Sequence, residues 1–281
     1  MYINPLQMHA KKTNLAMNNL SPIGIFDSGV GGLSVVNNIV NLLPFENLVY
    51  VADSKYAPYG SRSKEEIFDR SCVIINYLIQ SYNIKAIVVA CNTATAACIN
   101  ELRELFLIPI IGMEPAIKPA NRLSKNKRIG ILATSGTLKS SKFIALLSHY
   151  EGNSEFFSQP CHGLVEEIEK GLIDTSKTRA IINKNLSALK RKKIDVIILG
   201  CTHFVFIRHL IKEFFNEDIP IIDTGLAVAK RLLNQLEENN LLMNRSLEGK
   251  LIICTNDDSK QPQQTLKTLV PDLKYKLITF N

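Results

Sequence analysis

One stretch of the chain decides the fold: Ile84-Lys85-Ala86-Ile87-Val88-Val89-Ala90-Cys91-Asn92-Thr93. Its pattern returns as Ile194-Asp195-Val196-Ile197-Ile198-Leu199-Gly200-Cys201-Thr202-His203. Each copy is a short apolar run rich in β-branched residues, which is typical of a strand buried on both faces. Each run ends in a cysteine followed by residues that form hydrogen bonds. The repetition therefore predicts that Cys91 and Cys201 occupy equivalent strand ends.

Two further pairs of segments repeat in the same order. Ile108-Pro109-Ile110-Ile111-Gly112 matches Ile219-Pro220-Ile221-Ile222-Asp223, and Ile23-Gly24-Ile25-Phe26 matches Ile129-Gly130-Ile131-Leu132 more weakly. The simplest interpretation is a duplication that gives two similar lobes. Two lobes that face each other across a cleft would present two thiols from opposite walls. That is the geometry needed to move a proton on either face of one carbon.

Short apolar runs alternate with longer amphipathic segments, which indicates an α/β protein whose sheets are mainly parallel and flanked by helices. Strands are expected at residues 23–26, 48–52, 86–90, 128–133, 195–200, 220–223 and 251–255. Helices are expected at residues 33–43, 64–81 and 95–105. Ser63 and Glu66 form the pattern of a capping box at the start of the second of these helices. In such sheets ligands gather at the carboxyl ends of strands, where both repeated cysteines fall.

The boundary between the lobes is expected at residues 114–124, where Pro115 and Pro119 interrupt regular structure. The expected parts are a flexible N-terminal extension (1–20), a first α/β lobe (21–116 plus 228–281) and a second α/β lobe (117–227). The chain is expected to return to the first lobe near residues 223–229 and to add one extra strand and helix there.

The composition is that of an ordinary globular protein, because 281 residues with 46% hydrophobic content can bury a substantial core. No apolar stretch is long enough for a signal-peptide core or a bilayer span, so no membrane partner is expected. The six cysteines show no close-spaced pairs. This pattern argues against a disulfide framework or a zinc knuckle and favours a reducing, cytoplasmic location.

The net charge of +7 comes from cations that are mostly dispersed among acidic residues. The densest cluster, Lys190 to Lys193, ends an expected helix, where cations complement exposed carbonyl groups. This placement argues against a nucleic-acid partner, whereas an anionic small substrate would benefit from the positive field.

The two repeated cysteines are the main candidates for chemistry. A thiol between a strand and a helix N-terminus is expected to ionise below its ordinary pKa of about 8.5, which makes Cys91 a candidate acid or base. Cys201 follows its apolar run in the same way. Cys72, Cys98 and Cys254 lie inside apolar periodic runs and are expected to be small core residues.

Asp27 ends the first expected strand and precedes Ser28-Gly29-Val30-Gly31-Gly32. The glycines let a ligand approach the main chain, so this turn is either an anion cradle or a plain connection from strand to helix. It lacks the full dinucleotide fingerprint. A buried Asp27 would be costly without a partner, so a polar site is expected around it.

Two more side chains are candidates for acid–base work. His203 lies two residues after Cys201 and can set the protonation of that thiol, because the ordinary pKa of histidine is near neutrality. Glu166 lies in a run whose periodicity suits a helix with an acidic face toward the cleft, and a solvated surface carboxylate is the alternative. The five histidines show no zinc-ligand spacing, so no metal is expected.

Four motifs follow one another along the chain: Phe26-Asp27-Ser28-Gly29-Val30-Gly31-Gly32-Leu33, Pro58-Tyr59-Gly60, Ala90-Cys91-Asn92-Thr93-Ala94-Thr95 and Gly200-Cys201-Thr202-His203. Together they resemble the motifs of the glutamate racemase family, part of the aspartate/glutamate racemase superfamily. The likeness runs from about Ser21 to the end of the chain. Phe204-Val205-Phe206 and Pro160-Cys161-His162-Gly163 depart from the family pattern. Aspartate racemases usually carry Glu at the position of His203, so the resemblance points to glutamate.

The resemblance implies a racemase without a cofactor, in which Cys91 and Cys201 transfer protons on opposite faces of the α-carbon of glutamate. It also implies that Asp27 assists Cys91, and that His203, with Glu166 as a further candidate, assists Cys201. The residues implied to hold the substrate are Asp27, Ser28, Tyr59, Gly60, Asn92, Thr93, Thr134, Thr137, Thr202 and His203. In this family the product, D-glutamate, serves peptidoglycan synthesis. A homodimer is the candidate assembly.

Three alternatives remain at this point. A pyridoxal-dependent racemase would carry a cofactor with its own absorbance. A related enzyme with one or two cysteines would act on aspartate, hydantoin or malonate derivatives. A non-catalytic sensor of anions or nucleotides would use the glycine turn after Asp27, and its ligand binding would survive replacement of both repeated cysteines.

Overall fold

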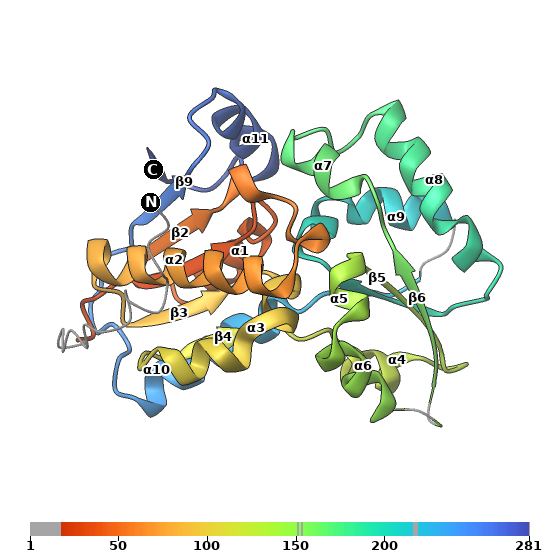
Figure 1. Ribbon diagram of the computed structural model, residues 1–281, viewed down its shortest axis with the longest axis horizontal. Coiled ribbons are helices and arrows are strands. Elements are labelled where there is room, and N and C mark those ends of the chain that lie inside the picture. Colours follow the sequence, from red (N-terminus) through yellow and green to blue (C-terminus); the bar gives the residue numbers. More distant parts are fainter. Residues whose placement is uncertain (1–17, 151, 153, 216–218, 281) are drawn as a thin grey trace.

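The computed structural model describes residues 18–150, 152, 154–215 and 219–280, so most of the expected N-terminal extension lies outside the described residues. The chain forms two parallel sheets flanked by helices, one in each of two lobes (Figure 1). The first sheet has the strand order β10-β9-β2-β1-β3-β4, and the second has the order β6-β5-β7-β8. The expected α/β class with two lobes is confirmed. None of the helices within these ranges is long and apolar enough to cross a bilayer.

The first lobe is built mainly from the earlier part of the chain. Its elements up to the first crossing are β1 (Ile23–Asp27), α1 (Leu33–Leu42), β2 (Leu48–Ala52), η2 (Ser54–Tyr56), η3 (Tyr59–Ser61), α2 (Lys64–Tyr82), β3 (Ala86–Val89), α3 (Asn92–Leu105) and β4 (Ile110–Gly112). The later elements that complete it are α10 (Gly225–Glu238), β9 (Leu251–Thr255), α11 (Gln261–Leu269) and β10 (Lys276–Thr279).

The second lobe lies between these two parts in sequence. Its elements are α4 (Ile117–Leu123), β5 (Arg128–Ala133), α5 (Ser135–Lys139), α6 (Ser141–Ser148), β6 (Glu155–Pro160), α7 (Leu164–Glu169), α8 (Ser176–Lys190), β7 (Val196–Gly200), η4 (Thr202–Ile207), α9 (Arg208–Phe215) and β8 (Ile221–Ile222). Helix α4 packs against β7, whereas α10 packs against α1 in the first lobe.

The order of the strands shows the same internal repeat as the sequence. The order β2-β1-β3-β4 in the first sheet matches β6-β5-β7-β8 in the second. The three repeated sequence segments fall on β1 and β5, on β3 and β7, and on β4 and β8. Equivalent strands therefore carry equivalent sequence, and the cysteines after β3 and β7 occupy matched positions.

Burial explains why the apolar runs form central strands. Every residue of β1, β2, β3 and β7 is buried, as expected for strands covered by helices on both faces. Helix α2 starts with the predicted capping box: the Ser63 hydroxyl accepts from the Glu66 N–H at 3.1 Å, and the Glu66 carboxylate accepts from the Ser63 N–H at 2.9 Å.

Three strands were not predicted: β4, β6 and β10. β4 is only three residues long, although its segment was recognised as part of the repeat. β6 and β10 lie at sheet edges and are half-buried or exposed, so they lack a continuous apolar run. The later part of the first lobe adds the pair β9 and β10 and the pair α10 and α11, rather than the single strand and helix expected.

A buried ion pair lies at the amino end of β3. The ammonium group of Lys85 lies 2.6 Å from a carboxylate oxygen of Glu46, and both side chains are fully enclosed. The Lys85 ammonium also donates to the backbone carbonyl of Asn19 at 2.7 Å, and the Met243 N–H donates to the other Glu46 oxygen at 2.7 Å. The pair thus connects four segments of the chain, at Asn19, Glu46, Lys85 and Met243.

Candidate active site

The two repeated cysteines lie at the carboxyl ends of equivalent strands. Cys91 follows β3 and is the N-cap of α3, where its sulfur accepts from the Ala94 N–H at 3.5 Å. Cys201 follows β7 and is the N-cap of η4. Both side chains are buried, with exposed fractions of 4% for Cys91 and 6% for Cys201. This is the edge at which open α/β sheets bind ligands.

The thiol of Cys91 does not ionise readily, contrary to the prediction. Burial raises the pKa of Cys91 well above its ordinary value, and the charges of Asp27 and Cys201 add to the increase. The Ala94 N–H lowers this pKa but does not offset the burial. A proton acceptor is therefore needed before Cys91 can act as a base. Cys72, Cys98 and Cys254 are buried core residues, as predicted.

Asp27 links the surroundings of the two thiols. One carboxylate oxygen accepts from the Ser28 N–H at 2.7 Å and the Ser28 hydroxyl at 3.3 Å, and that hydroxyl lies 3.9 Å from the Cys91 sulfur. The other oxygen accepts from the Gly32 N–H at 2.5 Å and from the Thr202 hydroxyl at 3.1 Å. Burial raises the pKa of Asp27, and the nearby His203 and Cys91 oppose that increase. Asp27 is thus linked through the Ser28 hydroxyl to Cys91 and bonded directly to Thr202, the residue after Cys201.

On the other side, Cys201 faces a histidine–carboxylate pair. The Cys201 sulfur lies 3.7 Å from Nδ1 of His203, and Nε2 of His203 lies 2.5 Å from a carboxylate oxygen of Glu169. Burial on its own lowers the pKa of His203, but hydrogen bonds to Cys201 and Glu169 outweigh it and raise the pKa well above the ordinary value. The arrangement favours a positively charged imidazole beside the thiol.

Glu169, not Glu166, is the acidic partner of His203. Both residues lie on α7, but the side chain of Glu166 is exposed to solvent. The prediction that Glu166 assists Cys201 is therefore wrong, because the carboxylate that contacts His203 belongs to Glu169, one helical turn later. Glu169 also accepts from the Val30 N–H at 2.8 Å, so it joins α7 of the second lobe to the glycine turn of the first.

The glycine turn is needed for close approach of side chains. A Cβ atom at Gly29 would overlap the carboxylate of Glu169, and one at Gly31 would overlap the ring of His203. The N–H groups of Val30 and Gly32 donate to Glu169 and Asp27, respectively. The turn thus holds protein carboxylates with two of its N–H groups.

Side chains from both lobes offer polar groups beside the thiols. The hydroxyl groups of Thr93, Thr134 and Thr137 form a mutual triad, with oxygen separations of 2.9, 3.2 and 3.0 Å. The side-chain amide of Asn92 is buried, and neither its oxygen nor its nitrogen has a hydrogen-bond partner among the described residues. A buried amide without partners is costly, so this group is suited to a polar ligand.

Tyr59 and Gly60 lie in η3, which packs against α5 across the cleft. The hydroxyl of Tyr59 donates to the carboxylate of Asp53 at 2.5 Å and is therefore already paired within the protein. Gly60 packs so closely against Thr134 that a Cβ atom at Gly60 would lie 2.7 Å from the Thr134 side chain. Asp53 also accepts from Arg70 at 2.6 Å and 3.0 Å. Neither Asp53 nor Arg70 was predicted to lie near the site.

A pocket of about 250 Å³ opens between the lobes beside Glu169. The residues that line it come from both lobes and are Val30, Ser54, Ala57, Pro58, Val165, Glu166, Glu169, Lys170, Asp257, Gln261 and Pro262. Neither Cys91 nor Cys201 lines this pocket. The candidate site itself lies where the two lobes meet, because Thr202 of the second lobe bonds to Asp27 of the first and Glu169 bonds to Val30. Among the described residues, no group of three or more His, Cys, Asp or Glu side chains is placed to hold a metal ion.

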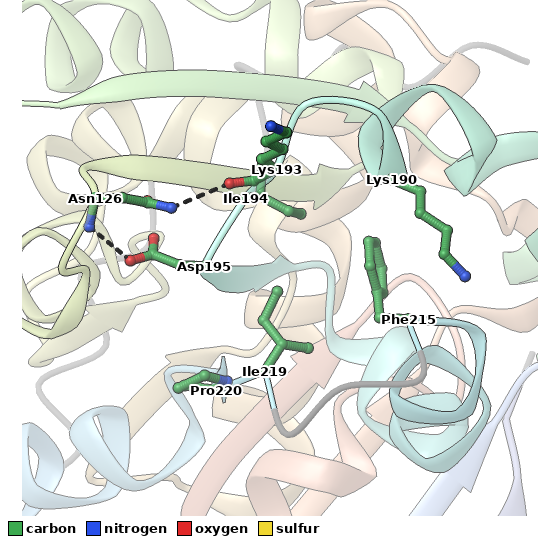
Figure 2. A pocket seen from close by; sticks show the side chains of 8 residues that line it. All are labelled: Asn126, Lys190, Lys193, Ile194, Asp195, Phe215, Ile219 and Pro220. Atoms are coloured by element: carbon green, nitrogen blue, oxygen red, sulfur yellow. Dashed lines mark hydrogen bonds between the residues drawn. The ribbon is translucent and has the colours of Figure 1, made fainter.

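A second hollow, of about 490 Å³, lies at the opposite end of the second sheet (Figure 2). Ile194 and Asp195 precede β7 there, and the nearby Lys190 ends α8. Figure 2 shows Asn126 bonded to the Asp195 carboxylate and to the carbonyl of Lys193. Because it lies at the amino ends of the strands, this hollow is separate from the two thiols. The basic cluster thus follows a helix, as predicted.

The sequence of the chain matches those of known racemases. The sequence model of the Asp/Glu/hydantoin racemase family matches residues 23–232. A glutamate racemase from Stutzerimonas stutzeri is 46% identical over 250 residues, which cover 89% of this chain and 92% of the relative. The chain belongs to the glutamate racemase family.

Solved structures of the family share the same architecture. The glutamate racemase from Escherichia coli, in complex with L-glutamate and the activator UDP-MurNAc-ala, has a TM-score of 0.82 and 31% identity, covering 92% of this chain and 97% of that one. The enzyme from Francisella tularensis in complex with D-glutamate has a TM-score of 0.81 and 29% identity, covering 94% and 98%. The chain is thus an isomerase of the racemase type with the two-lobe fold of this family.

Proposed function

We propose that this chain interconverts L- and D-glutamate by proton transfer at the α-carbon, without a cofactor and with Cys91 and Cys201 as the two acid–base groups. The observation that carries the proposal is the pair of buried thiols at equivalent strand ends, on either side of Asp27. Glutamate racemases from several bacteria, at 42–48% identity, support the choice of substrate.

Each thiol needs a group that takes its proton. Asp27, whose pKa is raised by burial, lies beside Cys91 and is suited to exchange a proton with it. His203 lies beside Cys201, and Glu169 stabilises the imidazolium that forms when the histidine takes the thiol proton. A thiolate formed in a buried site is a stronger base than one in water, which suits the removal of a weakly acidic α-proton.

In the proposed reaction, one thiolate removes the α-proton and breaks the C–H bond, which leaves a carbanion. The second thiol then donates its proton to the opposite face and forms a new C–H bond. The next turnover can run in the reverse sense, so the two enantiomers are treated evenly. Asn92 and the hydroxyl triad of Thr93, Thr134 and Thr137 would bind the polar groups of glutamate, since the Asn92 amide is otherwise unpaired among the described residues.

The test is an exchange experiment in deuterated water, with dialysed protein and each glutamate enantiomer in turn. Wild type should produce the opposite enantiomer carrying deuterium at the α-carbon. Cys91→Ala and Cys201→Ala should abolish racemisation while each keeps α-exchange from only one enantiomer, because one thiol remains. Cys72→Ala, at a core cysteine away from the site, is the matched control. If folded wild type produced neither D-glutamate nor deuterated substrate, the proposal would fail.

The proposed physiological role is supply of D-glutamate for peptidoglycan in the cytoplasm. The six cysteines are all free, which suits a reducing compartment. Depletion of the protein in its source cell should cause lysis that added D-glutamate prevents. Lysis that added D-glutamate did not relieve would contradict this role.

A further inference from the structure

Helix α7, which carries Glu169, ends in carbonyl groups that are only partly paired by N–H groups of the same segment. The last carbonyls of any helix lack partners within the helix and need others. The carbonyls of Glu167 and Ile168 accept from N–H groups of residues 170–172. The carbonyls of Glu169 and Lys170 accept instead from side chains of α11, in the other lobe. Figure 1 shows α7 and α11 facing each other at the junction of the lobes.

The contact between α11 and α7 is specific. The Thr265 hydroxyl donates to the carbonyl of Glu169 at 3.0 Å, and the Gln261 amide donates to the carbonyl of Lys170 at 3.0 Å. The same Gln261 nitrogen also lies 3.1 Å from the Thr265 hydroxyl. Thr265 is 1% exposed, so its bond is shielded from water. Gly171 turns the chain away with a φ of +73° and lies against the backbone of Thr265.

These bonds fix the backbone of the residue whose side chain contacts His203. The Glu169 carboxylate reaches Nε2 of His203 at 2.5 Å and the Val30 N–H at 2.8 Å. A short bond to a charged group depends steeply on position, so movement of this backbone would weaken it. We infer that Thr265 and Gln261 are positioning residues, which hold Glu169 against His203 from across the cleft.

The inference rests on the proposed function for its effect on catalysis, but it also predicts a direct effect on His203. The titratable groups that face this imidazole are Cys201 on its own segment, Glu169 from α7 and Asp27 at the end of β1. Glu169 favours the protonated imidazole. A loosened Glu169 should therefore lower the pKa of His203.

The experiment compares Thr265→Val, which keeps the shape and removes the donor, with Thr265→Ser, which keeps the hydroxyl. Thr268→Val is the matched control, because the hydroxyl of Thr268 bonds to Gln264 within α11 itself. The readouts are the pKa of His203 by NMR titration, assigned with His203→Gln, and the pH profile of kcat/KM for racemisation. Thr265→Val should lower kcat/KM about two- to tenfold, the factor that one neutral hydrogen bond supplies. It should also lower the pKa of His203, and Thr265→Ser should restore both.

An unchanged His203 pKa in folded Thr265→Val, or an equal change in Thr268→Val, would overturn the inference. Should Thr265→Val not fold, Gln261→Met gives the same comparison at the half-buried end of the contact. The NMR titration needs no turnover. A wild type without racemase activity would therefore refute the proposed function, while the titration would still decide whether α11 positions Glu169.

Discussion

Replacing Glu169 with Gln removes one negative charge from beside His203 and leaves the shape of the side chain. The amide oxygen can still accept from the Val30 N–H, but the bond to Nε2 of His203, now 2.5 Å long, loses its charge. Hydrogen bonds to charged groups contribute about 1.5–3 kcal/mol and neutral ones about 0.5–1.5 kcal/mol. The difference of about 1–2 kcal/mol corresponds to a decrease in kcat/KM of about 5- to 30-fold.

The same change should alter the pH dependence. The charge of Glu169 raises the pKa of His203, so its removal lowers that pKa. The imidazolium is present below this pKa and is lost as the pH rises through it. Activity that needs the imidazolium beside Cys201 should therefore fall at a lower pH in Glu169→Gln than in wild type. Initial rates of racemisation, followed by circular dichroism across a pH series, measure both effects.

Glu166→Gln is the matched control, since Glu166 lies one turn earlier on α7 and is exposed. Its kcat/KM should stay within about twofold of wild type, as expected for a surface substitution of about 0.5 kcal/mol or less. Thermal unfolding of both variants checks that the fold is intact. Equal losses in the two variants, or an unshifted basic limb in Glu169→Gln, would refute the assignment of Glu169 to His203.

Lys85→Met leaves the Glu46 carboxylate buried without its cation and should lower the free energy of unfolding by about 3–5 kcal/mol in urea titrations. The control Lys64→Met removes the exposed ion pair with Glu101 and should lower the free energy of unfolding by less than about 1 kcal/mol. Equal losses of stability in the two variants would contradict the importance of the buried pair. Thr134→Val removes one hydroxyl of the triad and should raise the KM for glutamate about tenfold, with kcat less affected. A KM that did not change would exclude Thr134 from substrate binding.

The sequence was sufficient to predict features that depend on local pattern. The apolar runs before Cys91 and Cys201 predicted β3 and β7, and their repetition predicted two similar lobes, whose sheets share a matched strand order. The capping box at Ser63 was likewise readable, because its two bonds join residues three apart. The half-exposed edge strands β6 and β10 were missed because these two segments carry no continuous apolar run.

Features of the site that depend on how the lobes meet could not be predicted in this way. Glu166 and Glu169 lie on one short helix, and only the contacts of α7 with α11 and with Val30 show which of them reaches His203. The pKa of Cys91 rises because the site is buried, whereas the sequence indicated only a helix N-terminus. The run Leu164 to Lys170 contained a signal that was not used, since Glu169 lies three residues after Glu166 and therefore on the same face of a helix.

The place of α11 in the chain affects biosynthesis. Ribosomes make proteins from the N-terminus, so both thiols, Asp27, His203 and Glu169 emerge before the segment that braces α7. A nascent chain can therefore contain every reacting group while its carboxylate–imidazole contact still lacks external support. The support that Thr265 gives to the backbone of Glu169 can therefore form only after α11 has been synthesised.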